Sequence, residues 1–216
     1  MQVPVIVLVG PPHHGKTEAR KILSEITFQR GESTSTVIYS FLAARRKQDI
    51  KELQALPKEE LRPELIEAGD FMVGKINEIR LSAIDPAVDQ SVYRIPSALV
   101  RTLYLNGYNI IDGVRRRPEL IDSIRHLEWN GVRTLVLWIE RPGADTVQDN
   151  TELTQADAHE VVYNDGSLED LKVKLKAVLE KYFGKQPEKH DPLPVFDNEG
   201  NVVPPGPKVA ERTSEL

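Results

Sequence analysis

The segment GPPHHGKT at residues 10–17 matches the pattern G-x-x-x-x-G-K-[ST]. Gly10 and Gly15 permit backbone angles and close approaches that a side chain would obstruct, so successive N–H groups can turn inward around an anionic oxygen. Lys16 adds a positive charge that reaches further phosphate oxygens, and Thr17 offers a hydroxyl group to Mg²⁺. The pattern therefore predicts a phosphate-binding loop.

The flanking residues supply the context that such a loop requires. VPVIVLVG at residues 3–10 is a short β-branched run, and KTEARKILSEIT at 16–27 carries apolar residues at helical spacing. Strand, loop and helix come in the required order, and the helix points the positive end of its dipole at the same oxygen atoms. A glycine-rich turn without a ligand is the alternative that this order disfavours.

Four loop residues occupy the variable positions of the pattern. Pro11 and Pro12 stiffen the chain and remove N–H donors outside the cradle. His13 and His14 are expected to be solvated, and a metal-binding or catalytic role for either is the lesser alternative, because two adjacent side chains diverge. We count all four among the residues that line the bound phosphate groups.

The composition limits the remaining classes of protein. A chain of 216 residues has room for one sizeable core, and a formal net charge of −5 gives no general attraction to nucleic acids or anionic membranes. The absence of cysteine excludes disulfides and cysteine-ligated zinc, which fits a reducing compartment. No apolar run approaches the roughly twenty residues of a membrane span, and the N-terminus lacks signal-peptide features, so we expect a cytoplasmic protein.

Strand-like and helix-like segments alternate along the chain. Strands are expected at 3–10, 35–40, 108–112, 132–140 and 159–164. Helices are expected at 16–27, 41–56, 58–84 with kinks at Pro63 and Gly69, 95–107, 117–131 and 167–183, with a connection at 85–94. This order predicts an α/β fold in three layers, with a parallel sheet of about five strands covered on both faces. Ligands of such sheets bind beyond the carboxyl ends of the strands.

The composition changes after Gly184. Residues 185–216 are rich in proline and charged residues and show no period. We expect an extended or disordered tail, and a docking segment is the alternative.

The segment NIIDGVRRRPEL at residues 109–120 is the second feature with chemical content. Asp112 ends an apolar strand, as does an aspartate that holds Mg²⁺ directly or through water in nucleotide-binding sheets. In a parallel sheet this position lies beside Thr17. An aspartate that only caps a helix or a turn is the alternative.

Three consecutive arginines, Arg115, Arg116 and Arg117, follow that aspartate. Their guanidinium groups can clamp phosphate groups of a donor and an acceptor. A solvated helix start is the alternative, but cations are mildly unfavourable at the amino end of a helix. We favour Arg115 for the ligand role, since it lies nearest the strand end.

These two segments, together with ADAHEVVYNDGSLEDL at residues 156–171, resemble the nucleoside monophosphate kinase group of P-loop proteins. Within that group the chain is similar to bacteriophage deoxynucleoside monophosphate kinases and to related phage kinases of DNA hypermodification. The resemblance covers most of residues 3–183 and implies a kinase domain at 1–184. It further implies a helical acceptor-binding insertion at about 40–95, a short lid at about 141–158 and, for a phage protein, a place in the host cytoplasm.

The resemblance also implies the cofactors ATP and Mg²⁺. The residues expected at the nucleotide are Gly10, Pro11, Pro12, His13, His14, Gly15, Lys16, Thr17 and Asn164, with Asp165 and Gly166 near the adenine. Thr17 and Asp112 are the expected metal ligands. The expected catalytic residues are Lys16, Asp112, Arg115, Arg116 and Arg141.

The predicted lid departs from the pattern of the group. Such lids supply several arginines, but this one contains only Arg141 and several carboxylates, so Arg115 and Arg116 are the expected replacements. Arg45, Arg46 and Arg101 are candidates for binding the acceptor. The favoured alternative is that each is an ordinary surface residue of a helix. Glu67 and Asp70 fall one helical turn apart, where they can orient or deprotonate a hydroxyl group or simply form an exposed face.

The acceptor of the phosphoryl group stays open at this point. A deoxynucleoside monophosphate is the first expectation, and 5-hydroxymethyluracil within DNA is the second. A third hypothesis is a non-kinase switch protein that binds ATP and hydrolyses it slowly. The oligomeric state is also open.

Overall fold

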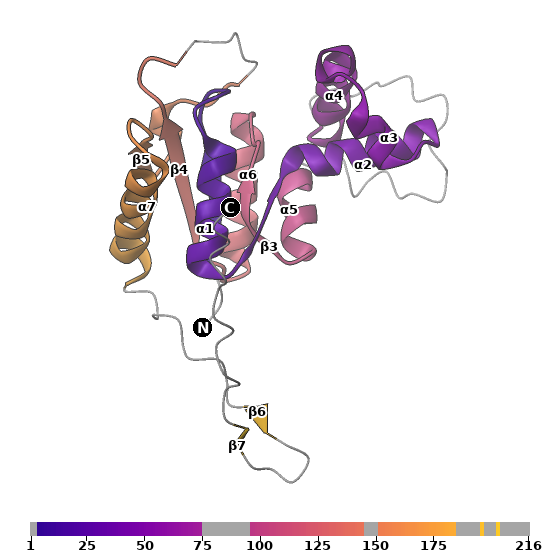
Figure 1. Ribbon diagram of the computed structural model, residues 1–216. Helices are drawn as coiled ribbons and strands as arrows, with labels where there is room; N and C mark the ends of the chain where they lie inside the picture. Colours follow the sequence, from indigo (N-terminus) through magenta and orange to yellow (C-terminus); the bar gives the residue numbers. More distant parts are fainter. Residues whose placement is uncertain (1–3, 75–95, 145–150, 185–194, 197–201, 204–216) are drawn as a thin grey trace, which may run out of the picture. The chain divides into compact units, whose positions relative to one another are not determined.

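The computed structural model describes residues 4–74, 96–144, 151–184, 195–196 and 202–203. Its contacts divide the chain into two units, residues 1–184 and 185–216. The first unit contains, in order, β1 (Val5–Val9), α1 (Lys16–Thr27), β2 (Arg30–Ser33), α2 (Thr34–Arg46), α3 (Ile50–Ala55), α4 (Lys58–Met72), α5 (Ala98–Leu105), β3 (Tyr108–Asp112), α6 (Arg117–Trp129), β4 (Thr134–Glu140), the 3-10 helix η2 (Gln155–Asp157), β5 (Glu160–Tyr163) and α7 (Leu168–Phe183) (Figure 1). The second unit contains β6 (Val195–Phe196) and β7 (Val202–Val203), which pair antiparallel.

The five strands of the first unit form a parallel sheet in the order β2-β3-β1-β4-β5. Alternate residues of β1 pack on opposite faces. Val5, Val7 and Val9 belong to the core cluster that contains α5 and α6 residues, whereas Ile6 and Leu8 pack with α1 and α7. Both faces of the sheet are therefore covered, which explains the uninterrupted apolar runs of the central strands. The predicted three-layer α/β fold is confirmed.

The helices α2, α3 and α4 enclose a small core of their own. It consists of Leu42, Ala43, Leu53, Leu61 and Ala68. This helical segment spans residues 34–72 after the edge strand β2, and it overlaps the range of about 40–95 expected for an acceptor-binding insertion. Its acceptor-binding role stays a prediction.

The strand predicted at 35–40 is wrong, because these residues lie within α2. Ser33 begins the helix, and its hydroxyl oxygen accepts a hydrogen bond from the backbone N–H of Ser35 at 3.4 Å. Val37 and Phe41 then lie one turn apart and pack in the core cluster that contains α5 and α6 residues. The burial of these side chains outweighs the β-propensity of the segment. The second strand is instead the polar tetrapeptide RGES at the edge of the sheet.

The helix predicted at 41–56 is interrupted. Lys47 takes a left-handed conformation (φ 53°) at the end of α2, and Asp49 caps α3 by accepting a hydrogen bond from Lys51 N–H at 2.7 Å. In the next predicted helix, α4 runs through Pro63 and ends at Met72. The rest of that helix and the predicted connection at 85–94 lie outside the described residues.

The other predicted elements are confirmed with small shifts in their ends. These are β1, α1, α5, β3, α6, β4, β5 and α7. Beyond Gly184 only the β6–β7 pair is described, so the extended or disordered tail stays a prediction. Within the described part of the chain, no helix has the length and apolar content that a membrane span requires.

Candidate functional site

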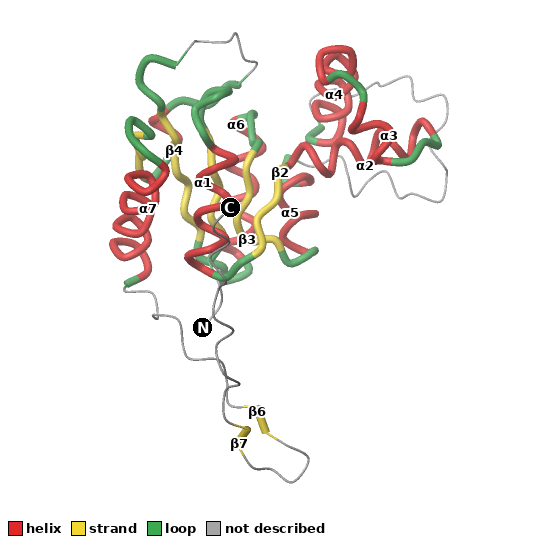
Figure 2. Tube along the Cα trace, in the orientation of Figure 1, coloured by secondary structure: helices red, strands yellow, loops and turns green. Residues whose placement is uncertain are grey.

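The sequence motifs meet at the carboxyl edge of the sheet. The loop at residues 10–15 joins β1 to α1, and Asp112 ends the neighbouring strand β3. Leu8 is in register with Asp112, so Asp112 lies level with the residue two positions before Gly10, where the loop begins. Figure 2 shows loops gathered at this upper edge, where α1 begins. This is the edge at which parallel sheets bind ligands.

Two glycines of the loop have conformations and neighbours that exclude other residues. Gly10 has φ +133°, and a Cβ there would lie 2.4 Å from the carbonyl oxygen of Ile139. Gly15 has φ +94°, and a Cβ there would lie 2.3 Å from Asn164 Nδ2. The loop is therefore pressed against β4 and against the residue that follows β5, as a backbone cradle for an anion requires.

Lys16 bends back over the loop. Its ammonium group donates hydrogen bonds to the carbonyl oxygens of Gly10, at 2.7 Å, and of Pro11. Gly15 caps α1 without a side-chain acceptor, so no capping side chain occupies the first N–H groups of the helix. Thr17, in the same first turn, is exposed. The ammonium group, the helix end and the accessible hydroxyl fit a phosphorylated ligand.

His14 is buried, which corrects the expectation that both histidines are solvated; His13 is exposed, with φ 64°. The Nδ1 atom of His14 accepts a hydrogen bond from the backbone N–H of Arg141 at 2.9 Å. Burial lowers the pKa of His14, although the carboxylate of Glu140 opposes this shift. A neutral imidazole in this place connects the loop to the end of β4.

Asn164 makes a second connection to the loop. Its Nδ2 donates to the carbonyl oxygen of His14 at 3.1 Å, and its backbone N–H donates to the backbone carbonyl oxygen of Glu140 at 2.6 Å. The neighbouring Asp165 pairs with Lys174 of α7. Asn164 therefore lies at the loop, and contact with an adenine stays a prediction for Asn164, Asp165 and Gly166.

Asp112 is 4% exposed and shares a charge network that sequence reasoning missed. The Nε atom of Arg20 lies 3.1 Å from Asp112 Oδ2, and Arg20 Nη1 lies 3.0 Å from Glu32 Oε1. Burial raises the pKa of Asp112, while the charges of Arg20 and Lys16 and a hydrogen bond from Ser33 oppose the shift. A signal was available for Arg20, because it lies one turn after Lys16 on the same helix; Glu32 was hidden in a strand that was not predicted.

The side chains of Thr17 and Asp112 are suitable ligands for Mg²⁺, but phosphate oxygens of a bound ligand would have to complete the coordination. Asp112 Oδ2 is buried without a hydrogen-bond partner, since its contact with Arg20 lacks hydrogen-bond alignment, and Thr17 is exposed on the adjacent helix. Among the described residues no group of three or more His, Asp or Glu side chains is placed to hold a metal. Mg²⁺ commonly binds in this way, through one or two protein ligands together with substrate phosphates.

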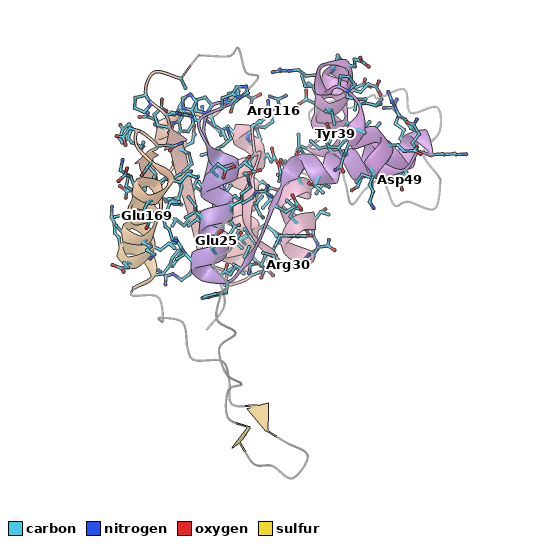
Figure 3. The ribbon with its side chains drawn as sticks, in the orientation of Figure 1. Glu25, Arg30, Tyr39, Asp49, Arg116 and Glu169 are labelled. Atoms are coloured by element: carbon cyan, nitrogen blue, oxygen red, sulfur yellow. The ribbon has the colours of Figure 1, made fainter. Side chains whose placement is uncertain are left out.

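The three arginines after β3 have separate environments. Arg116 Nε donates to Asp70 Oδ1 of α4 at 2.8 Å, and both side chains are largely buried. Arg116 is labelled in Figure 3. Arg117 donates from Nε and Nη2 to the two oxygens of Asp157 at 2.8 and 2.9 Å. Arg115 is exposed. The structure therefore joins Arg116 and Arg117 to carboxylates of this chain.

The segment predicted as a lid is anchored beside these arginines. The backbone N–H of Glu152 donates to the carbonyl oxygen of Arg115 at 2.8 Å, and Leu153 is buried in the main core. Asp157 closes a capping box with Thr154 and binds Arg117, which lowers the pKa of the Asp157 carboxyl. Asp157, one of the carboxylates that set this segment apart from an arginine-rich lid, thus has a structural use. Residues 145–150 lie outside the described part of the chain, and Arg141 is exposed at the start of the segment.

Glu119 is a further residue that sequence reasoning missed. It is 2% exposed in the first turn of α6, and its Oε1 atom has no hydrogen-bond partner. Burial raises its pKa to about 8, although backbone hydrogen bonds from Arg115 and Arg116 favour the charged form. A glutamate in the first turn of a helix is usually exposed, so the sequence contains no signal for this burial.

The predicted acceptor-side residues are distributed over α2, α4 and α5. Arg46 pairs with Glu64 between α2 and α4, whereas Arg45 and Arg101 are half-buried in α2 and α5. Asp70 binds Arg116, and Glu67 lies one turn earlier, half-buried. An open pocket lies beside α6 without reaching the phosphate loop; its lining residues are Pro96, Arg117, Pro118, Ile121, Asp122, Arg125 and Glu152. Acceptor roles for these arginines stay predictions.

No protein-family model and no curated protein sequence matches this chain. Solved structures with a similar arrangement include an unliganded sugar kinase from Janibacter, at 12% identity over 83% of this chain and 95% of that one, with a TM-score of 0.40. Shikimate kinase from Aquifex aeolicus has 12% identity over 83% and 98% of the two chains, with a TM-score of 0.42. TT1252 from Thermus thermophilus has 21% identity over 85% and 100%, with a TM-score of 0.39. We take no activity from these similarities.

Proposed function

We propose that this protein is an ATP-dependent phosphotransferase that moves the γ-phosphate of Mg-ATP to a deoxynucleotide acceptor. One observation carries the proposal: the glycine loop between β1 and α1 lies beside the buried Asp112 and holds the Lys16 ammonium over its own carbonyl groups. A positively charged cradle next to a carboxylate is the arrangement that binds a phosphate chain with its metal ion.

The first residues of α1, Asp112 and the nearby arginines have separate roles in this proposal. Lys16 exchanges its carbonyl partners for phosphate oxygens, and the N–H groups at the start of α1 bind the same chain. Thr17 and Asp112 would hold Mg²⁺, which would offset the phosphate charge. Arg115 is exposed near the strand end and is the first candidate to meet the transferring group, as in other electrostatic stabilisation. Arg116 and Arg141 are further candidates.

The acceptor is proposed as a deoxynucleoside monophosphate held near α2–α4. The Arg116–Asp70 pair favours a second candidate, 5-hydroxymethyluracil in DNA, because it places a carboxylate beside a candidate catalytic arginine. The net charge of −5 counts against a DNA strand as the acceptor. A switch that only hydrolyses ATP is the third candidate.

The test supplies γ-labelled ATP and Mg²⁺ with two acceptor pools, deoxynucleoside monophosphates and duplex DNA that contains 5-hydroxymethyluracil. Label in a nucleoside diphosphate supports the proposal. Label retained on DNA establishes the second candidate, and label only in free phosphate favours the switch. No consumption of ATP, with any acceptor, would overturn the phosphotransferase proposal.

Lys16→Ala is the first variant to compare. We expect transfer to fall at least about 100-fold, since a charge that stabilises the transferring group is removed. Lys21→Ala is the matched control, because Lys21 is exposed on the same helix and pairs with Glu18. Circular dichroism checks that both variants fold. Unchanged turnover in Lys16→Ala would remove the loop from the mechanism.

A further inference from the structure

His14 connects three separate parts of the carboxyl edge. Its Nδ1 atom accepts the backbone N–H of Arg141 at 2.9 Å, and its own carbonyl oxygen accepts from Asn164 Nδ2 at 3.1 Å. The side chain is 3% exposed. The residue therefore ties the phosphate loop to the ends of β4 and β5 at once.

The contact with Arg141 defines the state of the imidazole. An Nδ1 atom that accepts a hydrogen bond carries no proton, so the neutral ring holds its proton on Nε2. Burial disfavours the charged ring, the carboxylate of Glu140 favours it, and the charges of Lys16, Arg141 and His13 oppose it. A doubly protonated ring cannot accept from Arg141, so only the neutral form supports this connection.

The surrounding contacts leave little freedom at this junction. Gly15 lies against Asn164, and the backbone N–H of Asn164 donates to the carbonyl oxygen of Glu140 at 2.6 Å. Glu140 is itself held, because its Oε2 atom accepts from Trp138 Nε1 at 2.6 Å. Both polar groups of the Glu140–Arg141 peptide are thus hydrogen-bonded, the N–H group to His14 of the loop and the carbonyl oxygen to Asn164.

We infer that His14 is a positioning residue, which sets the place of Arg141 relative to the phosphate loop through the Nδ1 contact. This inference rests on the proposed phosphotransfer, in which Arg141 is the arginine of the segment after β4. His14 does not touch the reacting atoms. It fixes the backbone from which the guanidinium group of Arg141 extends.

The experiment compares His14→Ala and His14→Asn with the parent protein. Asparagine keeps an acceptor atom at the position of Nδ1, whereas alanine removes it. We expect His14→Ala to lower kcat about tenfold with KM for ATP unchanged within about twofold, as for an interaction that acts in the transition state. His14→Asn should restore kcat to within about threefold of the parent protein. A His14→Asn variant as slow as His14→Ala would overturn the inference.

His159 provides a matched control. Its Nδ1 atom accepts a hydrogen bond from the backbone N–H of Val136 in β4, which is the same kind of contact. His159 lies just before β5, however, and not in the loop after β1. We expect His159→Ala to leave kcat unchanged within about twofold. A loss equal to that of His14→Ala would show a general effect on the sheet and would contradict a specific role.

A double-mutant cycle with Arg141→Ala tests the route of the effect. If His14 acts through Arg141, the double variant should be no slower than Arg141→Ala alone. Multiplied losses would mean that His14 acts by another route, and the inference would fail. Should His14→Ala not fold, His14→Leu removes the same acceptor atom while filling more of the space, and it takes the place of alanine in the cycle.

Amide hydrogen exchange separates this inference from the proposed function. The N–H of Arg141 should exchange at least about tenfold faster in His14→Ala than in the parent protein and should stay protected in His14→Asn. This result does not depend on turnover. Protection without ATP consumption would reject the phosphotransferase alone, whereas equal exchange in all three proteins would reject the positioning role.

Discussion

The buried carboxyl group of Glu119 makes the stability of the folded protein depend on pH. This carboxyl group is buried in α6 and accepts hydrogen bonds from the backbone N–H groups of Arg115 and Arg116, two of the three arginines proposed to act in transfer. Burial raises its pKa from 4.5 to about 8. The folded protein therefore keeps a proton on Glu119 at neutral pH, while the unfolded chain does not.

Glu119→Gln tests this linkage through stability. Between the unfolded pKa of 4.5 and the folded pKa of about 8, only the folded state binds the proton, so the free energy of unfolding of the parent protein falls as pH rises. Glutamine has no such proton. We expect urea denaturation to show Glu119→Gln gaining stability relative to the parent protein from pH 5 to pH 8. A difference that does not change with pH would contradict a buried, protonated Glu119.

Contacts between elements place the helical segment beside the proposed site. The Arg116–Asp70 pair joins the start of α6 to α4 across 46 residues of sequence, and the two side chains are 11% and 14% exposed. A largely buried pair of this kind is costly to break from one side, because the remaining charge loses its partner. The pair therefore supports the position of α4 as well as that of Arg116.

Asp70→Asn removes the negative charge and keeps the shape. We expect the free energy of unfolding to fall by about 2 kcal/mol, the usual scale for a hydrogen bond between charged groups. Glu67→Gln, one turn earlier in α4, is the control and should change it by less than about 0.5 kcal/mol. Guanidinium denaturation measures both values. Equal stability of the two variants would show that the pair does not hold α4.

The strand β2 illustrates the limit of prediction for elements. RGES contains no apolar alternation, and it becomes a strand because the exposed edge of β3 offers hydrogen-bond partners. The β-branched segment after it forms α2 because Ser33 caps the helix and Val37 reaches the core. In both cases a neighbour outweighed local propensity.

At the scale of the whole molecule, the described cores lie within the first unit. The three clusters and the residues packed against them fall between Val5 and Phe183. Tyr182 and Phe183 close one of these clusters at the end of α7. The first unit therefore has the buried contacts that an independent fold requires.

A chain that ends at Gly184 tests this independence. We expect its free energy of unfolding to match that of the full chain within about 1 kcal/mol, since the described apolar clusters are retained. A chain that ends at Glu180 is the control, because it also loses Tyr182 and Phe183 and should be less stable by at least about 2 kcal/mol. Equal losses in both chains, measured by urea denaturation, would show that residues 185–216 contribute to the fold.

The sequence by itself determined the glycine loop between β1 and α1, the central strands and most helices. Glycines at 10 and 15, contiguous apolar runs and the Ser167–Asp170 capping box are local signals, and each acts within a few residues. Tertiary structure alone decided which charges are paired. Arg20 of α1 meets Asp112, Arg116 meets Asp70 of α4, and His14 meets the backbone N–H of Arg141, because the fold brings segments that are distant in sequence together at one edge of the sheet. Burial there favours such contacts, since a buried polar group without a partner costs free energy.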